Sequence, residues 1–177
     1  MLQFLTPHFR IDRVEELTPK RLREWGLSAL LLDVDCTLKR YGRQEVSPEV
    51  AAWIEQLRAK GIVMCLVSNG MGGRIRRFAE RLDLPCVSLA MKPLPRGIRS
   101  AMRRLALRPS QTAMVGDQLF ADVMAGRLAG VRTILVRPNH PEEEPWFTRL
   151  KRRPERWLLG RMRDQGPGVS GWHVPEP

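Results

Sequence analysis

Residues 30–40 read LLLDVDCTLKR, three leucines that lead directly into two aspartates separated by one valine. The apolar residues predict a buried strand over residues 28–35, and the two carboxylates stand where that strand ends. Four more apolar runs further along the chain have the same character, which is typical of strands covered on both faces. They predict strands at residues 62–69, 85–90, 112–117 and 131–138.

Helix signals separate these predicted strands. Ser47 and Pro48 are typical of the N-cap and first position of a helix, Gly61 follows its last turn, and residues 17–26 repeat this pattern. The predicted helices lie in the segments 17–26 and 47–61, which include their flanking cap residues, and in the segments 73–84, 95–107 and 120–130. Strands that alternate with helices favour an α/β fold, a Rossmann-like doubly wound parallel sheet of five strands with right-handed crossovers.

Composition indicates one domain with tails and a basic surface. The chain has 177 residues, of which 43% are hydrophobic, and carries a net charge of +11. Arginine outnumbers lysine by 25 to 5. Because arginine binds phosphate groups through two parallel hydrogen bonds, this surface suits partners such as anionic lipid, nucleotide or nucleic acid. A basic surface that is merely solvated is an equally good interpretation.

The cysteines and the ends of the chain indicate a cytoplasmic protein. Cys36, Cys65 and Cys86 form no C-x-x-C pair, which argues against a disulfide framework or a zinc site. The first ten residues lack the features of a signal peptide, and no apolar run approaches the ~18 residues of a membrane span. We expect a cytoplasmic location, with peripheral contact to the inner face of the membrane as an open alternative.

Polar residues follow three of the predicted strands. Asp33 and Asp35 end the first, Ser68 and Asn69 end the second, and Asp117 ends the fourth. In open parallel sheets the ligand site lies beyond the carboxyl ends of the strands, so these side chains are expected to lie close together. Two carboxylates at a spacing of two residues point to the same side of an extended chain.

Four short motifs now suggest a family. DVDCTL (33–38), SNG (68–70), KP (92–93) and GDQLFAD (116–122) resemble the four ordered motifs of haloacid dehalogenase-like (HAD) phosphohydrolases. The resemblance covers roughly residues 28–137. Each motif lies at a predicted strand end or just beyond one, which makes the set far more specific than any single member.

The flanks are similar to the bacterial YqeG branch of HAD subfamily IIIA. They include the stretch before the first motif and the segment WFTRLKRRPERWLL at residues 146–159. Relatives of that branch include phosphatidylglycerophosphate phosphatases. The sequence departs from the branch at Cys36 and Gly70, where asparagine is usual. Neither departure removes a catalytic group, but either could alter how the substrate is positioned.

The resemblance implies a catalytic set with a magnesium ion. Asp33 would be the nucleophile that forms an aspartyl-phosphate, Asp35 the general acid and base, and Thr37 the residue that orients this pair. Asp33, the main-chain carbonyl of Asp35 and Asp117 would bind Mg²⁺, which prefers oxygen ligands. Lys92 and the metal would offset the negative charge that repels an anionic nucleophile from a phosphate.

The remaining predicted residues surround this set. Ser68 would donate a hydrogen bond to the phosphoryl group, assisted by the turn at Asn69 and Gly70, and Lys39 would contact substrate from a flap. Asp122 would hold Lys92 or a metal-bound water. Structural roles are also open: Ser68 as a turn residue, Asp122 as an acid in the first turn of a helix, and Lys39 as a solvated cation.

Short spacings between the motifs predict a capless enzyme. Asp35, Ser68 and Lys92 are 33 and 24 positions apart, and each gap is filled by one predicted helix and strand, whereas a domain needs ~50 residues. The predicted divisions are an N-terminal segment with a short helix (1–27), the catalytic core (28–137) and a basic C-terminal tail (138–177). An open site suits a phosphate carried by something large.

The tail favours a membrane surface as that partner. Residues 149–163 carry seven basic groups against one acid, with Trp157 among them, a composition that suits an anionic interface. An equally good interpretation is that the segment packs its tryptophan on the domain and leaves its charges solvated. Together with this tail, the resemblance to relatives of the phosphatidylglycerophosphate phosphatases implies hydrolysis of phosphatidylglycerophosphate at the membrane surface. The alternatives are a phosphatase for a soluble phosphomonoester or a nucleic-acid end, and a non-catalytic basic protein that binds nucleic acid, although no known nucleic-acid-binding pattern is visible.

Overall fold

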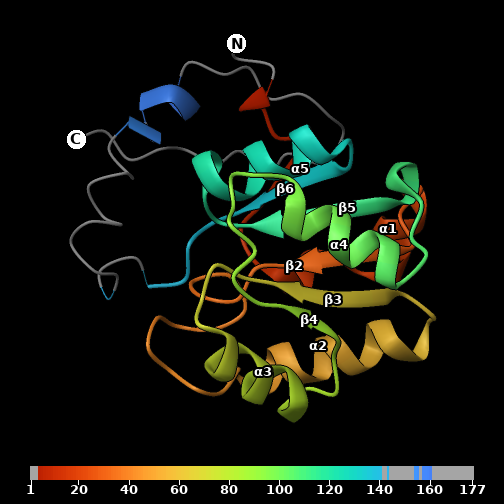
Figure 1. Ribbon diagram of the computed structural model, residues 1–177. Helices are drawn as coiled ribbons and strands as arrows, with labels where there is room; N and C mark the ends of the chain where they lie inside the picture. Colours follow the sequence, from red (N-terminus) through yellow and green to blue (C-terminus); the bar gives the residue numbers. More distant parts are fainter. Residues whose placement is uncertain (1–3, 141–142, 144–153, 156, 161–177) are drawn as a thin grey trace.

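A central parallel sheet forms the body of the molecule (Figure 1). The computed structural model describes residues 4–140, 143, 154–155 and 157–160. Within them the strand order is β1-β6-β5-β2-β3-β4, and every pairing is parallel. The strands are β1 (Phe9–Ile11), β2 (Ala29–Leu32), β3 (Val63–Val67), β4 (Cys86–Val87), β5 (Thr112–Gly116) and β6 (Arg132–Val136). The predicted doubly wound α/β fold is confirmed.

The predicted number of strands is wrong by one, because the N-terminal segment contributes β1. This strand pairs with β6, with Phe9 opposite Ile134 and Ile11 opposite Val136. A three-residue strand is too short to show a periodicity in the sequence. The ring of Phe9 also stacks on Trp25, with ring centroids 3.8 Å apart, which joins the segment before residue 28 to the core.

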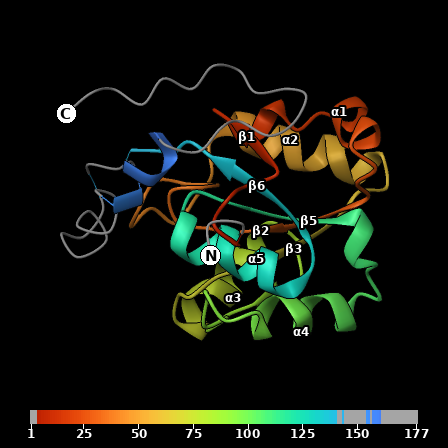
Figure 2. The same cartoon turned by 90° about the horizontal axis from the view of Figure 1, so that it is seen from above.

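Helices cover both faces of the sheet (Figures 1 and 2). They are α1 (Pro19–Glu24), α2 (Pro48–Ala59), α3 (Gly72–Arg81), α4 (Arg96–Arg104) and α5 (Met124–Ala129), and a π-helical turn (Leu119–Val123) precedes α5. Leu30 and Leu32 of β2 face the core beneath α1, α2 and α3, whereas Leu31 faces the core beneath α4 and α5. Alternation along one buried strand therefore supplies both cores.

The predicted caps of two helices are present. The Thr18 hydroxyl accepts a hydrogen bond from the backbone N–H of Arg21 at 3.2 Å, and the Ser47 hydroxyl accepts one from Val50 at 3.3 Å. Each side chain satisfies a donor that the helix leaves without a partner. The other three helices are shorter than predicted, since α3 and α4 end before their last predicted turn and the π-helical turn replaces the start of the third.

Part of the basic tail lies against the sheet. Leu159 is buried with Leu119, Val123 and Leu135, and a Glu155 carboxylate oxygen accepts a hydrogen bond from the backbone N–H of Phe120 at 2.9 Å. Most of the predicted membrane segment, residues 149–153, 156 and 161–163, lies outside the described residues. Across the described part of the chain, no helix has both the length and the apolar character needed to cross a membrane.

Candidate active site

The ends of three adjacent strands bring the predicted residues together. β2 lies between β3 and β5, with Leu32 opposite both Leu66 and Val115. Asp33 therefore leaves the sheet beside Ser68 and Asp117, and its backbone N–H donates to the carbonyl of Val115 at 2.9 Å. The predicted convergence at the carboxyl edge follows directly from strand order.

Asp33, Asp117, Asp122 and Lys92 form a buried aspartate cluster. The Lys92 ammonium donates to Asp33 Oδ1 and to Asp122 Oδ1, each at 2.6 Å, and to the carbonyl of Val67 at 2.9 Å. None of the four cluster residues is more than 7% exposed. Two carboxylates thus share one ammonium, and the third carboxylate, Asp117, lies close to both in a place that water does not screen.

Thr37 joins two of these carboxylates. Its hydroxyl lies 3.0 Å from Asp117 Oδ1 and 3.5 Å from Asp33 Oδ2, so its single proton is better placed for Asp117. We expected Thr37 to orient Asp33 and Asp35, but the hydrogen bonds of its hydroxyl in the described structure go to Asp117 and Asp33. Instead, Thr37 connects the first and fourth motifs.

The backbone around Asp122 is shaped to admit its carboxylate. Asp122 lies in the π-helical turn, and its Oδ2 accepts a hydrogen bond from the N–H of Gln118 at 3.0 Å. A Cβ atom at Gly116 would lie 2.3 Å from the carboxyl carbon of Asp122. Glycine is therefore required at position 116 for Asp122 to reach Lys92. Asp122 also lies in the first turn of this helical segment, as the alternative interpretation predicts, and the two roles are compatible.

Burial controls the ionisation of the cluster. It raises the pKa of Asp33 to about 6, although the charge of Lys92 acts in the opposite direction. Burial also raises the pKa of Asp122. For Lys92, burial alone would lower the pKa, but the carboxylates of Asp122 and Asp33 outweigh it and raise the pKa above its ordinary range.

The aspartates are suited to hold a divalent cation. Carboxylate oxygens of Asp33, Asp117 and Asp122 all lie within 4.8 Å of one another. One ammonium does not neutralise three buried carboxylates, and oxygen donors are the ligands that Mg²⁺ selects. Asp122 fits this set as well as the predicted Asp33 and Asp117. It already contacts Lys92, so the expectation that Asp122 would hold that lysine agrees with the geometry.

Asp35 occupies a different environment, which we call the Asp35 clamp, formed with Lys39 and Arg74. Arg74 donates to both carboxylate oxygens, at 3.0 and 2.6 Å, and the Lys39 ammonium donates at 2.5 Å. Burial would raise the pKa of Asp35, but the hydrogen bonds from Arg74 and then Lys39 outweigh it and lower the pKa. Sequence reasoning missed Arg74. The sequence offers one indication of its role: Arg74 is a basic residue in the first turn of the helix that follows the second motif.

Asn69 fixes the backbone of Lys92. Its side chain donates to the carbonyl of Lys92 at 2.9 Å and accepts from the N–H of the same residue at 2.7 Å. Ser68 is buried, and its hydroxyl accepts from the N–H of Gly70 at 3.1 Å, as the turn interpretation predicts. Contacts of Asn69, Gly70, Ser68 and Lys39 with a substrate stay predictions.

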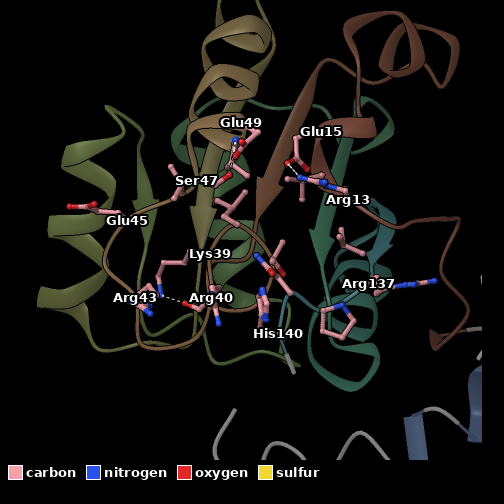
Figure 3. A pocket seen from close by; sticks show the side chains of 18 of the residues that line it. Arg13, Glu15, Lys39, Arg40, Arg43, Glu45, Ser47, Glu49, Arg137 and His140 are labelled. Carbon is pink, nitrogen blue, oxygen red and sulfur yellow. Dashed lines mark hydrogen bonds and ion pairs between the residues drawn. The ribbon is translucent and has the colours of Figure 1, made fainter. Parts of the chain in front are cut away.

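A small cavity of about 110 Å³ opens on this chemistry. It is lined by Asp33, Asp35, Cys36, Tyr41, Asn69, Lys92, Gln118, Ala121 and Asp122. A larger hollow of about 930 Å³ lies beside it, between residues 37–50 and the end of β6 (Figure 3). Acids and bases alternate around the larger hollow, for example Arg13 with Glu15 at 3.0 Å, so it lacks the unbalanced charge of the small cavity.

A model of the haloacid dehalogenase-like hydrolase family matches residues 7–130. The chain belongs to this family. The HAD protein is 30% identical to the "Probable phosphatase YqeG" of Bacillus subtilis (strain 168) over 164 residues, which cover 93% of this chain and 95% of that protein. These matches confirm the prediction of a HAD-type phosphatase of the YqeG branch.

Two further relatives of this HAD chain are longer proteins. It is 34% identical to a phosphoserine phosphatase of Thermus thermophilus over 116 residues. These residues cover 58% of the chain and 47% of that relative. It is 24% identical to the chloroplastic/mitochondrial phosphatidylglycerophosphate phosphatase 1 of Arabidopsis thaliana over 173 residues. These residues cover 93% of the chain and 50% of that relative. The chain thus spans about half the length of each.

Proposed function

We propose that this protein is a Mg²⁺-dependent phosphomonoester hydrolase that acts through an aspartyl-phosphate on Asp33 and dephosphorylates phosphatidylglycerophosphate at a membrane surface. The buried aspartate cluster carries the proposal. Asp33, Asp122 and Lys92 line a cavity together with Asp35, and Asp117 lies within 4.8 Å of the first two. This is the composition needed to attack a phosphate ester with an anionic nucleophile.

Asp33 is the nucleophile. One of its carboxylate oxygens bonds to phosphorus while the bond between phosphorus and the alcohol oxygen of the substrate breaks. Lys92, 2.6 Å from Asp33 Oδ1, supplies positive charge next to the reacting oxygen and holds the carboxylate in place. Asn69 fixes the backbone of that lysine, so the ammonium stays in position as the charge moves.

Asp35 moves the proton. It gives a proton to the leaving alkoxide in the first half of the reaction, and in the second half it takes one from the water that attacks phosphorus and frees Asp33. The Asp35 clamp favours the ionised form. The negative charge of an arriving phosphate competes for Arg74 and Lys39, which loosens their hold on Asp35 and prepares it to carry a proton.

The aspartates would hold the cation, with Asp33 and Asp117 as the predicted side-chain ligands and the carbonyl of Asp35 as a third. When bound, Mg²⁺ would neutralise phosphate charge next to the nucleophile. Thr37 keeps Asp117 in register with Asp33, and Asp122 keeps Lys92 between them.

Two observations support a lipid substrate. In residues 4–140 no further domain is inserted between β2 and β3 or between β3 and β4, which leaves the cavity accessible to a phosphate on a large carrier. The Arabidopsis relative, which matches along 93% of the chain, is a phosphatidylglycerophosphate phosphatase. The phosphoserine phosphatase relative, which matches along 58%, favours a soluble phosphomonoester as the second candidate.

The test is phosphate release with and without Mg²⁺, with Asp33→Asn as the blank. Phosphatidylglycerophosphate in vesicles is compared with phosphoserine and other soluble phosphomonoesters. We expect turnover that requires Mg²⁺ and is highest on the lipid. Higher turnover on a soluble ester would keep the chemistry and reject the lipid, whereas Mg²⁺-dependent turnover by Asp33→Asn would reject Asp33 as nucleophile.

A further inference from the structure

Four large apolar side chains are exposed on two loops at the active-site edge. Met71 is 74% exposed, Leu89 62%, Met91 57% and Leu94 46%. They are half of the eight large apolar residues that are exposed in the described part of the chain, although they lie within residues 71–94. We call these four residues the apolar rim. Such a concentration outside the core indicates a binding surface.

Hydrogen bonds hold the two loops together beside the catalytic lysine. The N–H of Leu89 donates to the carbonyl of Gly70 at 3.3 Å, and the side chain of Asn69 donates to the carbonyl of Lys92 at 2.9 Å. Within the second loop, the N–H of Leu94 donates to the carbonyl of Met91 at 2.9 Å. Lys92, whose ammonium binds Asp33, lies within the second loop. The apolar rim therefore borders the site through which a phosphate must enter.

The backbone of the second loop is strained in a way that keeps these side chains out of the core. Leu89 and Met91 have φ of 50° and 56°, a left-handed conformation that such residues rarely adopt. Between them Ala90 is buried, and its N–H donates to the carbonyl of Ser68 at 3.0 Å. The loop thus anchors one small residue and leaves its large apolar neighbours exposed. Strain of this kind is typical of functional segments.

The surroundings of the apolar rim are basic. Residues 56–79 and 84–116 contain no aspartate or glutamate. Helices α3 and α4 both begin at the carboxyl edge of the sheet, on either side of β4, so their first turns flank the apolar rim (Figure 1). Arg96 and Arg99 are exposed on the first turn of α4, and Arg76 and Arg77 are exposed on the second turn of α3.

We infer that the apolar rim and these four arginines form the surface by which the protein docks on an anionic lipid bilayer, with the aspartate cluster facing the head groups. This inference rests on the proposed lipid substrate. Side chains of Met and Leu at loop tips can enter the interface between head groups and acyl chains, while arginines beside them bind lipid phosphates. A second copy of the chain would place the arginines of both copies next to one another, which is electrostatically unfavourable. Nucleic acid would bind the arginines but would not provide an apolar environment for the methionine and leucine side chains.

The test measures binding apart from hydrolysis. Wild type and variants are floated with phosphatidylcholine vesicles that contain or lack phosphatidylglycerol, in the absence of Mg²⁺. Leu89→Asn with Met91→Asn introduces asparagine, which tolerates the left-handed backbone conformation, and removes the apolar side chains. We expect about a tenfold or greater loss of vesicle binding. Val63→Thr, which changes an exposed apolar residue at the opposite end of β3, should bind as wild type does.

Arg76→Ser with Arg77→Ser tests the charges without changing the loops. Binding to vesicles that contain phosphatidylglycerol should fall roughly fivefold for each arginine, and binding to neutral vesicles should change little. Turnover of a soluble phosphomonoester by both double variants should stay at the wild-type level. Turnover of the soluble substrate distinguishes a loss of membrane binding from damage to the active site. If the loop variant does not fold, the arginine double variant still tests the inference.

Wild-type binding by both double variants, or equal binding of wild type to neutral and anionic vesicles, would overturn the inference. Capture of an acidic protein with no vesicle binding would overturn it as well. Vesicle binding without hydrolysis of phosphatidylglycerophosphate would instead reject the proposed substrate and leave the docking surface standing.

Discussion

The buried aspartate cluster and the Asp35 clamp begin two residues apart on one strand exit, yet their charges are balanced in opposite ways. The cluster contains three carboxylates and one ammonium, that of Lys92, which binds two of them, whereas in the clamp one carboxylate accepts hydrogen bonds from both Lys39 and Arg74. The pKa of Asp33 is accordingly raised, mainly by burial, and that of Asp35 is lowered. The aspartate cluster has an excess of negative charge and can bind a cation. In the Asp35 clamp, an arriving phosphate can take the place of the Asp35 carboxylate as the partner of Arg74 and Lys39.

Removing the nucleophile should have the largest effect. Asp33→Asn should lower kcat/KM by at least about a thousandfold, because an amide in place of the carboxylate cannot form the aspartyl-phosphate. Steady-state phosphate release checks this. The melting temperature without metal should not fall, since the change removes one of three crowded charges. A lower melting temperature would contradict this account of the cluster.

Removing the shared ammonium should cost stability. Lys92→Met leaves the buried carboxylates of Asp33 and Asp122 without their ammonium partner, so the free energy of unfolding should fall by roughly 3–5 kcal/mol. Urea denaturation in the presence of a chelator measures it. Lys60→Met, at an exposed position just after α2, is the matched control and should be nearly neutral. Adding Mg²⁺ should restore part of the loss by mass action, and failure to do so would argue against a cation among these aspartates.

Opening the clamp should affect substrate binding more than folding. Arg74→Ala should lower kcat/KM roughly tenfold, mainly through KM, because one charge-assisted contact to phosphate is lost. The stability change should stay below about 1 kcal/mol, as for a half-exposed ion pair. Arg77→Ala on the same helix is the comparison for soluble substrates. Equal effects from both would show that Arg74 acts only through general positive charge.

The smallest effect is a difference in pH dependence between two asparagine variants without metal. Asp33 has a raised pKa, about 6, so its ionisation destabilises the fold as pH rises from about 4 to 6. Asp35 has a lowered pKa, so its contribution is present above the ordinary aspartate pKa and is lost as pH falls below it. Asp33→Asn should therefore gain stability over wild type as pH rises, while Asp35→Asn should lose it. Unfolding curves at several pH values measure both, and slopes of the same sign would contradict the comparison.

The sequence predicted those parts of the site that depend on strand order. Asp33, Ser68 and Asp117 follow apolar runs, so a parallel sheet places them at one edge whatever the details of packing. The contact of Arg74 with Asp35, 39 positions apart, depends instead on how α3 leaves its turn. Likewise, β1 becomes visible only when Phe9 is seen opposite Ile134, because three residues carry no pattern of their own.

The pairing of β1 with β6 also determines when the sheet can be completed. The N–H of His8 donates to the carbonyl of Thr133 at 3.0 Å, a contact between positions 125 residues apart. During synthesis the segment around β1 leaves the ribosome before β6 and, among the described strands, has no partner until β6 follows. The first strand to be made is thus the last that can join the sheet, and until then Phe9 has no completed core to enter.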